Sequence, residues 1–271
     1  MNIIFFKIAL VVYLFGSAFS LAFLLWARKM FSRVGKWALT GGFAVHSLAL
    51  VLRYIEAGHT PITSLHESLS FFAWSIVGFY FLLEIKYHVE VLAAFISPVA
   101  AVLIILASFL PKEILPLAPV LESFWLPIHV IFAFWGNAIF TLAFAAGVMY
   151  LIQERQIKSK KIGPFYYRLP ALKVLDDLNY RCLTFGFPLL TLGIISGSVW
   201  AESAWGAYWS WDPKETWSLI TWFLYAALLH GRLTVGWRGR RAAIFAIVGF
   251  GALVFSLFGV NLLLTGLHSY T

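Results

Sequence analysis

The sequence predicts an all-α polytopic membrane protein with about eight transmembrane helices and both termini on the external side. Of its 271 residues, 61% are hydrophobic and only 12% are charged, and the mean hydropathy is +0.86. Such a composition excludes an ordinary water-soluble domain. Several apolar runs also reach the ~20 residues that a helix needs to cross a ~30 Å hydrocarbon core.

Eight apolar runs follow one another along the chain, at roughly 3–26, 38–55, 67–86, 90–110, 127–152, 182–200, 214–231 and 242–264. The first run has no small-residue cleavage site after a basic segment, so we expect a retained helix rather than a signal peptide. Basic segments separate the first two runs and the fifth and sixth, and Asp212-Pro213 begins the seventh. The longest loop, about 153–180, is too short to build a core. We therefore expect residues 1–271 to form a single integral membrane domain.

The positions of the basic residues predict how the chain is oriented in the membrane. Sixteen of the 20 Lys and Arg residues fall on one face of this arrangement: Arg28, Lys29, Arg33, Lys36, Lys86, Arg155, Lys158, Lys160, Lys161, Arg168, Lys173, Arg181, Arg232, Arg238, Arg240 and Arg241. The positive-inside rule makes this face cytoplasmic, so the segment between the sixth and seventh runs faces outward. The net charge of +8 is then a topology signal, and we expect no nucleic-acid partner.

Six of the twelve tryptophans lie within 23 residues, Trp200–Trp222, hereafter the Trp-rich segment. An ordinary interfacial belt has one or two Trp or Tyr residues at each interface. The clustering favours a platform for a flat, apolar ligand, with its external part at about 200–216; a thick interfacial belt is the alternative. Trp200 and Trp222 fall within helical runs, so we expect them to be packing or belt residues.

Asp212, Pro213 and Glu215 fit a helix start, with Asp as N-cap, Pro at the first position and Glu at the third. Capping is therefore the simplest role for the two acidic residues. The same outward helix end offers N–H groups and a partial positive charge, which would also suit the carboxylates of an anionic ligand.

Histidines are the usual protein ligands of haem, a flat aromatic molecule whose iron can bind one axial ligand on each face. His129 lies at the outer end of the fifth run and His268 just past the eighth, on the side of the Trp-rich segment. Together they could supply bis-imidazole coordination; solvated or hydrogen-bonded side chains are the alternative.

The other histidines fall elsewhere. His230 belongs to the inner half of the seventh run, about 20 Å along the helix from Trp217. His46 lies in mid-membrane, where we expect a neutral ring hydrogen-bonded to a neighbouring helix. Three more are expected to be solvated: His59, His66 and His88. Cys182 is the only cysteine, which excludes an internal disulfide, a CxxC motif and a covalent c-type haem site, and we expect it to be a packing residue.

The stretch WGAYWSWDPKETWSLITW resembles the WWD signature, WGxxWxWD, of the haem-handling protein superfamily. The chain is most similar to the CcsA/ResC proteins of the System II cytochrome c maturation pathway, and less so to the CcmC and CcmF proteins of System I. RYIEAGHTP, HESLSFFAW, HGR and the terminal GLHSY extend the resemblance over most of the chain. It is weakest before residue 40 and in the 153–180 loop. His66-Glu67 departs from the expected Tyr-Glu.

The resemblance implies specific roles. His129 and His268 correspond to the external axial ligands of the haem iron, and His230 to a membrane-embedded histidine of an inner haem site. The WWD platform corresponds to Trp205, Gly206, Trp209, Trp211 and Asp212. A CcsB/ResB-type partner would supply a second inner histidine. Arg53 and Lys214, the outward cations nearest the site in topology, are candidate partners of the haem propionates.

The implied function is delivery of haem b across the membrane and its presentation to the CxxCH motif of apocytochrome c, as a subunit of a holocytochrome c synthase. The membrane would be a bacterial plasma membrane or a thylakoid membrane, with the haem site facing the periplasm, lumen or exterior. No general acid or nucleophile can be identified. The alternatives are a haem exporter without a ligation role, a HemX-like protein affecting haem biosynthesis, and a quinone-binding subunit.

Overall fold

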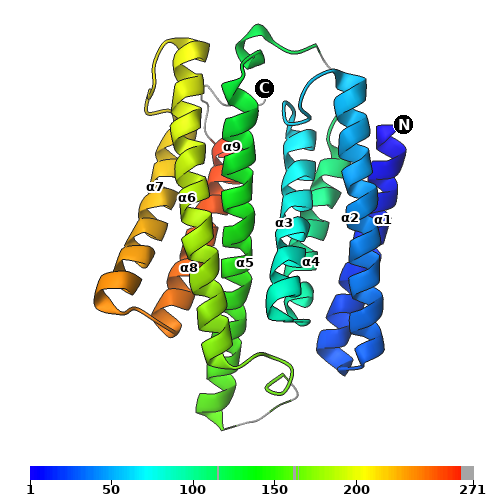
Figure 1. The fold of residues 1–271 in the computed structure, drawn as a ribbon, viewed down its shortest axis with the longest axis vertical. Coiled ribbons are helices and arrows are strands. Elements are labelled where there is room, and N and C mark those ends of the chain that lie inside the picture. The colour runs from blue at the N-terminus through cyan, green and yellow to red at the C-terminus, as the bar shows by residue number, and fades with distance from the viewer. Residues whose placement is uncertain (115, 161–162, 164, 264–271) are drawn as a thin grey trace. The chain divides into compact units, whose positions relative to one another are not determined.

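The computed structural model describes residues 1–114, 116–160, 163 and 165–263 (Figure 1). Eight helices in this part of the chain are long and apolar enough to cross a membrane. The predicted all-α polytopic membrane fold is thereby confirmed, whereas the side on which the termini lie stays a prediction. The helices group into two compact units. Their union into the single membrane domain expected from the sequence also stays a prediction.

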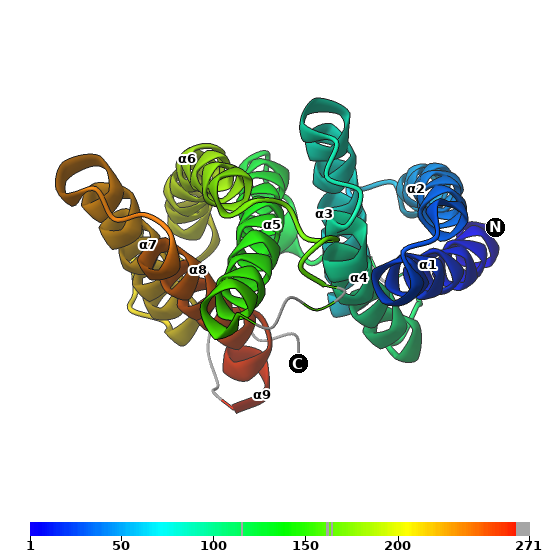
Figure 2. The same cartoon turned by 90° about the horizontal axis from the view of Figure 1, so that it is seen from below.

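The first unit covers Met1–Leu117 and Tyr167–Leu169 and contains four helices: α1 (Asn2–Trp26), α2 (Lys29–Ala57), α3 (Leu65–Tyr87) and α4 (Leu92–Phe109). Helix α1 packs along α2 and also against α4, and α3 packs against α4 (Figures 1 and 2). The α1–α2 contact is close because Gly42 leaves room for Tyr13, whose ring would lie 2.6 Å from a Cβ at that position. Small residues at helix crossings are the usual means of close packing in membranes.

The second unit covers Ala118–Tyr166 and Pro170–Thr271. Its helices are η1 (Pro119–Leu121), α5 (Trp125–Ser159), α6 (Leu172–Trp205), α7 (Pro213–His230), the π-helical η2 (Gly231–Val235), α8 (Arg240–Val254), the π-helical η3 (Phe255–Gly259) and α9 (Val260–Leu263). Helices α5 and α6 pack along each other, and α8 contacts both α5 and α7 (Figure 2). Gly136 of α5 faces the backbone of Leu190 of α6, where a Cβ would lie 2.8 Å from the Leu190 nitrogen.

Several helices begin earlier or end later than hydropathy predicts. Helix α2 starts at Lys29 and not near 38, and α6 starts at Leu172 and not near 182. Lys and Arg are good helix formers, so the basic segments continue the helices beyond their apolar parts. Helix α5 has 35 residues and is about 52 Å long at 1.5 Å per residue, well beyond a ~30 Å hydrocarbon core. Hydropathy therefore marks the spanning part of each helix, not its ends.

The buried polar residues test three further expectations. His46 is fully buried, and its Nε2 lies 2.8 Å from Ser70 Oγ of α3, as expected for a ring that hydrogen-bonds a neighbouring helix. Cys182 is buried, as expected of a packing residue. The expectation that His66 is solvated is wrong. His66 is the second residue of α3, and the helix turns its ring inward, where Nδ1 donates to the Ala107 carbonyl over 2.7 Å.

Candidate functional site

The Trp-rich segment begins inside α6 and ends inside α7, and its central loop is fixed at both ends. Gly206 ends α6 at φ +75°, the left-handed conformation that glycine adopts at little cost, and its N–H donates to the Glu202 carbonyl over 2.9 Å. Asp212 begins α7 as its N-cap, with the Lys214 N–H 2.9 Å from Asp212 Oδ1. Gly206 and Asp212 thus bound the loop.

Glu215 completes the predicted capping box. Its Oε2 accepts from the Asp212 N–H at 3.2 Å and from the Ser210 N–H at 2.8 Å. Asp212 and Glu215 are both buried, so their carboxylates are committed to backbone donors of the loop and of the first turn of α7. This confirms the capping role that the sequence predicts for both residues. It also holds the loop that carries Trp209 and Trp211 tightly against the helix start.

The tryptophan rings of this segment form two edge-to-face pairs. The ring centroids of Trp200 and Trp205 are 5.0 Å apart at 72°, and those of Trp209 and Trp211 are 5.8 Å apart at 87°. Trp211 is 68% exposed and has φ +58°, which is rare for a bulky residue. Such a backbone costs on the order of 1–3 kcal/mol and is typical of ligand sites. The loop therefore presents a large indole outward in a conformation that local packing alone would not favour.

His129 lies in the first turns of α5, at the same end of the second unit as the Trp-rich loop (Figure 1). Its Nδ1 donates to the Gly193 carbonyl of α6 over 2.7 Å. Because a carbonyl only accepts, this bond places the ring hydrogen on Nδ1 and the lone pair on Nε2. A histidine whose Nδ1–H is held by a backbone carbonyl is the usual form of a metal-binding imidazole.

Trp200 connects His129 with Trp205, the last residue of α6. The rings of Trp200 and His129 are nearly parallel, at 15° with centroids 6.2 Å apart, and Trp200 also contacts Trp205. Trp200 is buried, and its Nε1 donates to the Val120 carbonyl over 3.2 Å. The sequence correctly predicts a packing role for Trp200 but not its contact with His129. That contact joins the start of α5 and the last turns of α6 in one aromatic cluster.

Two further histidines belong to the predicted site. His268 lies outside the described residues. His230 is the last residue of α7 and is exposed, directly before the π-helical turn η2. An exposed ring on a membrane helix is accessible to lipid or to another chain. Its role in an inner haem site stays a prediction.

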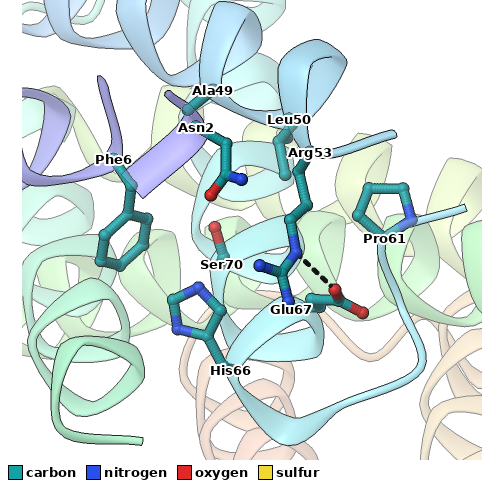
Figure 3. A pocket seen from close by; sticks show the side chains of 9 residues that line it. All are labelled: Asn2, Phe6, Ala49, Leu50, Arg53, Pro61, His66, Glu67 and Ser70. Atoms are coloured by element: carbon teal, nitrogen blue, oxygen red, sulfur yellow. Dashed lines mark hydrogen bonds and ion pairs between the residues drawn. The ribbon is translucent and has the colours of Figure 1, made fainter. Parts of the chain in front are cut away.

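The two candidate propionate partners differ in setting. Lys214 is partly exposed in the first turn of α7, beside Asp212. Arg53 belongs to the first unit and is buried in an ion pair with Glu67, with Nε 2.7 Å from Oε1 (Figure 3). Its Nη1 donates to the Lys112 carbonyl over 2.7 Å and its Nη2 to the Glu113 carbonyl over 3.1 Å. Arg53 thus joins α2, α3 and the segment after α4.

Arg53, His66, Glu67 and Ser70 line a cavity of about 20 Å³ in the first unit, together with Asn2 and four apolar or proline residues (Figure 3). A space of this size holds about one water molecule. Haem is far larger. The cavity is therefore part of the polar network around Arg53 and is not the expected haem site.

Comparison with known proteins identifies the family. Residues 62–268 match the family described as cytochrome C assembly protein. The cytochrome c biogenesis protein CcsA of Synechococcus elongatus is 39% identical, over 85% of this chain and 86% of that protein. CcsA of Guillardia theta is 38% identical over 83% and 81%, and CcsA of Chlamydomonas reinhardtii is 43% identical over 82% and 64%.

A solved structure shares the fold. The cytochrome c haem lyase CcmF superposes with a TM-score of 0.70 at 17% identity, over 95% of this chain. The chain spans 46% of that lyase, so the likeness concerns the helical arrangement and not the whole lyase. The chain is a multi-pass membrane protein that belongs to the cytochrome c assembly protein family, among its CcsA cytochrome c biogenesis proteins.

Proposed function

We propose that this chain binds haem b as a substrate on the external side of the membrane and presents it to apocytochrome c. The observation that carries the proposal is the setting of His129. Its Nδ1–H is held by the Gly193 carbonyl, and its ring lies against Trp200, which in turn contacts Trp205 of the WWD-like segment. An oriented imidazole beside an indole cluster suits a planar metal macrocycle. The relatives' names support a role in cytochrome c maturation.

The second axial ligand in this proposal is His268, from the C-terminal segment. The Trp-rich loop would support the macrocycle, with Trp205, Gly206, Trp209, Trp211 and Asp212 as the WWD platform. Lys214 would pair with a propionate, as would Arg53 through N–H groups that its bonds to Glu67 and the two carbonyls do not use. The positive charges of Lys214 and Arg53 are complementary to the negative charge of a haem propionate.

The proposed reaction requires that haem and the CxxCH segment be positioned, and it assigns no acid or base to this chain. Each cysteine thiol of a CxxCH segment adds across a vinyl group of haem. A carbon–sulfur bond forms, the thiol hydrogen moves to the neighbouring vinyl carbon, and nothing leaves. No oxidant or reductant is consumed. The histidine of the CxxCH motif then replaces one of the two axial imidazoles, so the chain contributes orientation and a defined ligand set.

Haem would reach this site from the cytoplasmic side near His230. The exposed position of His230 suits a site completed by another chain, and we propose a CcsB/ResB-type membrane protein as the source of the second inner ligand. The orientation follows the positive-inside rule. It puts the Trp-rich loop in the periplasm or the thylakoid lumen, and both termini on that side.

Replacement of each external histidine tests the proposal. His129→Ala or His268→Ala should convert a low-spin haem spectrum to a high-spin one and stop cytochrome c maturation. Added imidazole should restore both, because a free ligand can occupy the vacated iron position. His88→Ala, which removes an exposed ring at the end of α3, is the matched control and should change neither. Wild-type spectra and maturation in both external variants would show that these histidines are not the ligands.

A further inference from the structure

The position of the His129 ring depends on a glycine that faces it from the neighbouring helix. A Cβ built on Gly197 of α6 would lie 2.6 Å from His129 Cε1 and closer still to Nδ1. Its third neighbour, Cγ at 3.3 Å, also belongs to His129. Real Cβ atoms essentially never approach other atoms this closely, so any side chain at residue 197 must displace the imidazole.

The displaced atoms belong to a side chain and not to the backbone. The nearest atoms to a Cβ at Gly193, four residues earlier, are by contrast the backbone nitrogen of Ala133 at 2.9 Å and its Cα at 3.0 Å. A methyl group at residue 193 would therefore push α5 and α6 apart. A methyl group at residue 197 can be accommodated when the partly exposed ring of His129 rotates away, which leaves the helix packing in place.

We infer that Gly197 is a positioning residue for haem binding: its missing side chain keeps the imidazole of His129 on the Gly193 carbonyl. Neighbouring turns of α6 then position the ring. The carbonyl of Gly193 holds Nδ1 at 2.7 Å, and Gly197 provides the space in which the Nδ1 edge lies. Trp200, one turn further along, stacks on the ring face. The inference rests on the proposed role of His129 as an axial ligand.

The expected effect is a loss of ligation without a loss of folding. Rotation of the imidazole breaks its bond to Gly193 and turns Nε2 away from the iron position. Groups that orient a metal ligand typically contribute about 10- to 100-fold to metal affinity. Gly197→Ala should therefore weaken haem binding by about that factor and raise the high-spin fraction of the haem that remains bound.

A double-mutant comparison tests whether Gly197 acts through His129. Haem affinity is measured by titration of the purified chain in detergent, for wild type, Gly197→Ala, His129→Ala and the double variant. Gly197→Ala should weaken binding in the presence of His129 and change it less than about twofold in the His129→Ala background. In that background the added methyl group meets no imidazole, so any loss of affinity there would come from helix packing and not from His129. Gly251→Ala in α8, where a Cβ has no neighbour within 4 Å, is the matched control and should bind haem like wild type.

The outcomes separate this inference from the proposed function. An equal loss in both backgrounds would mean that Gly197 acts through helix packing, and unchanged affinity in Gly197→Ala would mean that the ring can bind iron from another position. Either result overturns the inference while His129 remains a ligand. If His129→Ala itself leaves affinity and spectrum unchanged, the proposed function fails.

Discussion

The buried pair of Arg53 and Glu67 allows a quantitative prediction that separates a structural role for Arg53 from haem binding. The side chains of Arg53 and Glu67 are 5% and 3% exposed, and Nε lies 2.7 Å from Oε1. Arg53→Ala removes this bond and the two bonds to the Lys112 and Glu113 carbonyls. Loss of one partner of a buried ion pair costs about 3–5 kcal/mol, because the other charge stays buried without compensation. We expect a destabilisation in this range.

The assay is reversible unfolding in mixed micelles, followed by helical circular dichroism, with haem content measured on the folded fraction. Lys112→Ala is the matched control: it removes a cation from the same network but keeps the backbone carbonyl that Arg53 uses. It also removes the hydrogen bonds from Lys112 Nζ to the Ser108 and Leu110 carbonyls, so it should lower the unfolding free energy by about 1–2 kcal/mol, less than Arg53→Ala. If Arg53→Ala is as stable as the control but has lost haem, Arg53 contacts the propionates and the structural account of it is wrong.

Three further predictions concern the Trp-rich segment and the topology. The triple replacement of Trp205, Trp209 and Trp211 by Ala should lower the haem content seen in absorption spectra while membrane insertion stays normal. A full haem content would mean that these tryptophans form only an interfacial belt. Asp212→Ala should destabilise α7 by about 1 kcal/mol in thermal unfolding, whereas Asp212→Asn, which keeps an N-cap oxygen, should cost less; equal effects would contradict the cap. Reporter fusions should read cytoplasmic after residues 33, 88, 165 and 238 and external after residues 60, 118, 206 and 271. A cytoplasmic signal at 206 would place the platform on the wrong side.

Features encoded locally in the sequence could be predicted. The capping box of Asp212 and Glu215 lies within four residues, so its spacing alone predicts the start of α7. The eight spanning helices follow from apolar runs, because the backbone of a lipid-exposed segment must satisfy its own hydrogen bonds. The helix starts at Lys29 and Leu172 could not be predicted in this way, since hydropathy indicates where a helix crosses the membrane and not how far it continues outside it.

The contacts between helices could not be predicted from the sequence. His129 and Gly193 are 64 residues apart, and nothing in either stretch indicates that they meet. The only available signal was the four-residue spacing of Gly193 and Gly197, which is typical of close helix packing but does not name the side chain that fills the space. The expectation for His66 is wrong for a related reason. Its loop sequence is polar, yet the capping box at Ser64 starts α3 there and turns the ring into the unit.

The absorption spectrum of the purified membrane protein tests the central claim most directly. If His129 and His268 hold haem between them, the protein should carry haem when isolated. Its oxidised and reduced spectra should then be those of a low-spin, six-coordinate iron with two imidazole ligands. A protein that is isolated without haem from cells making cytochrome c, or one whose haem is high-spin and five-coordinate, would contradict the claim.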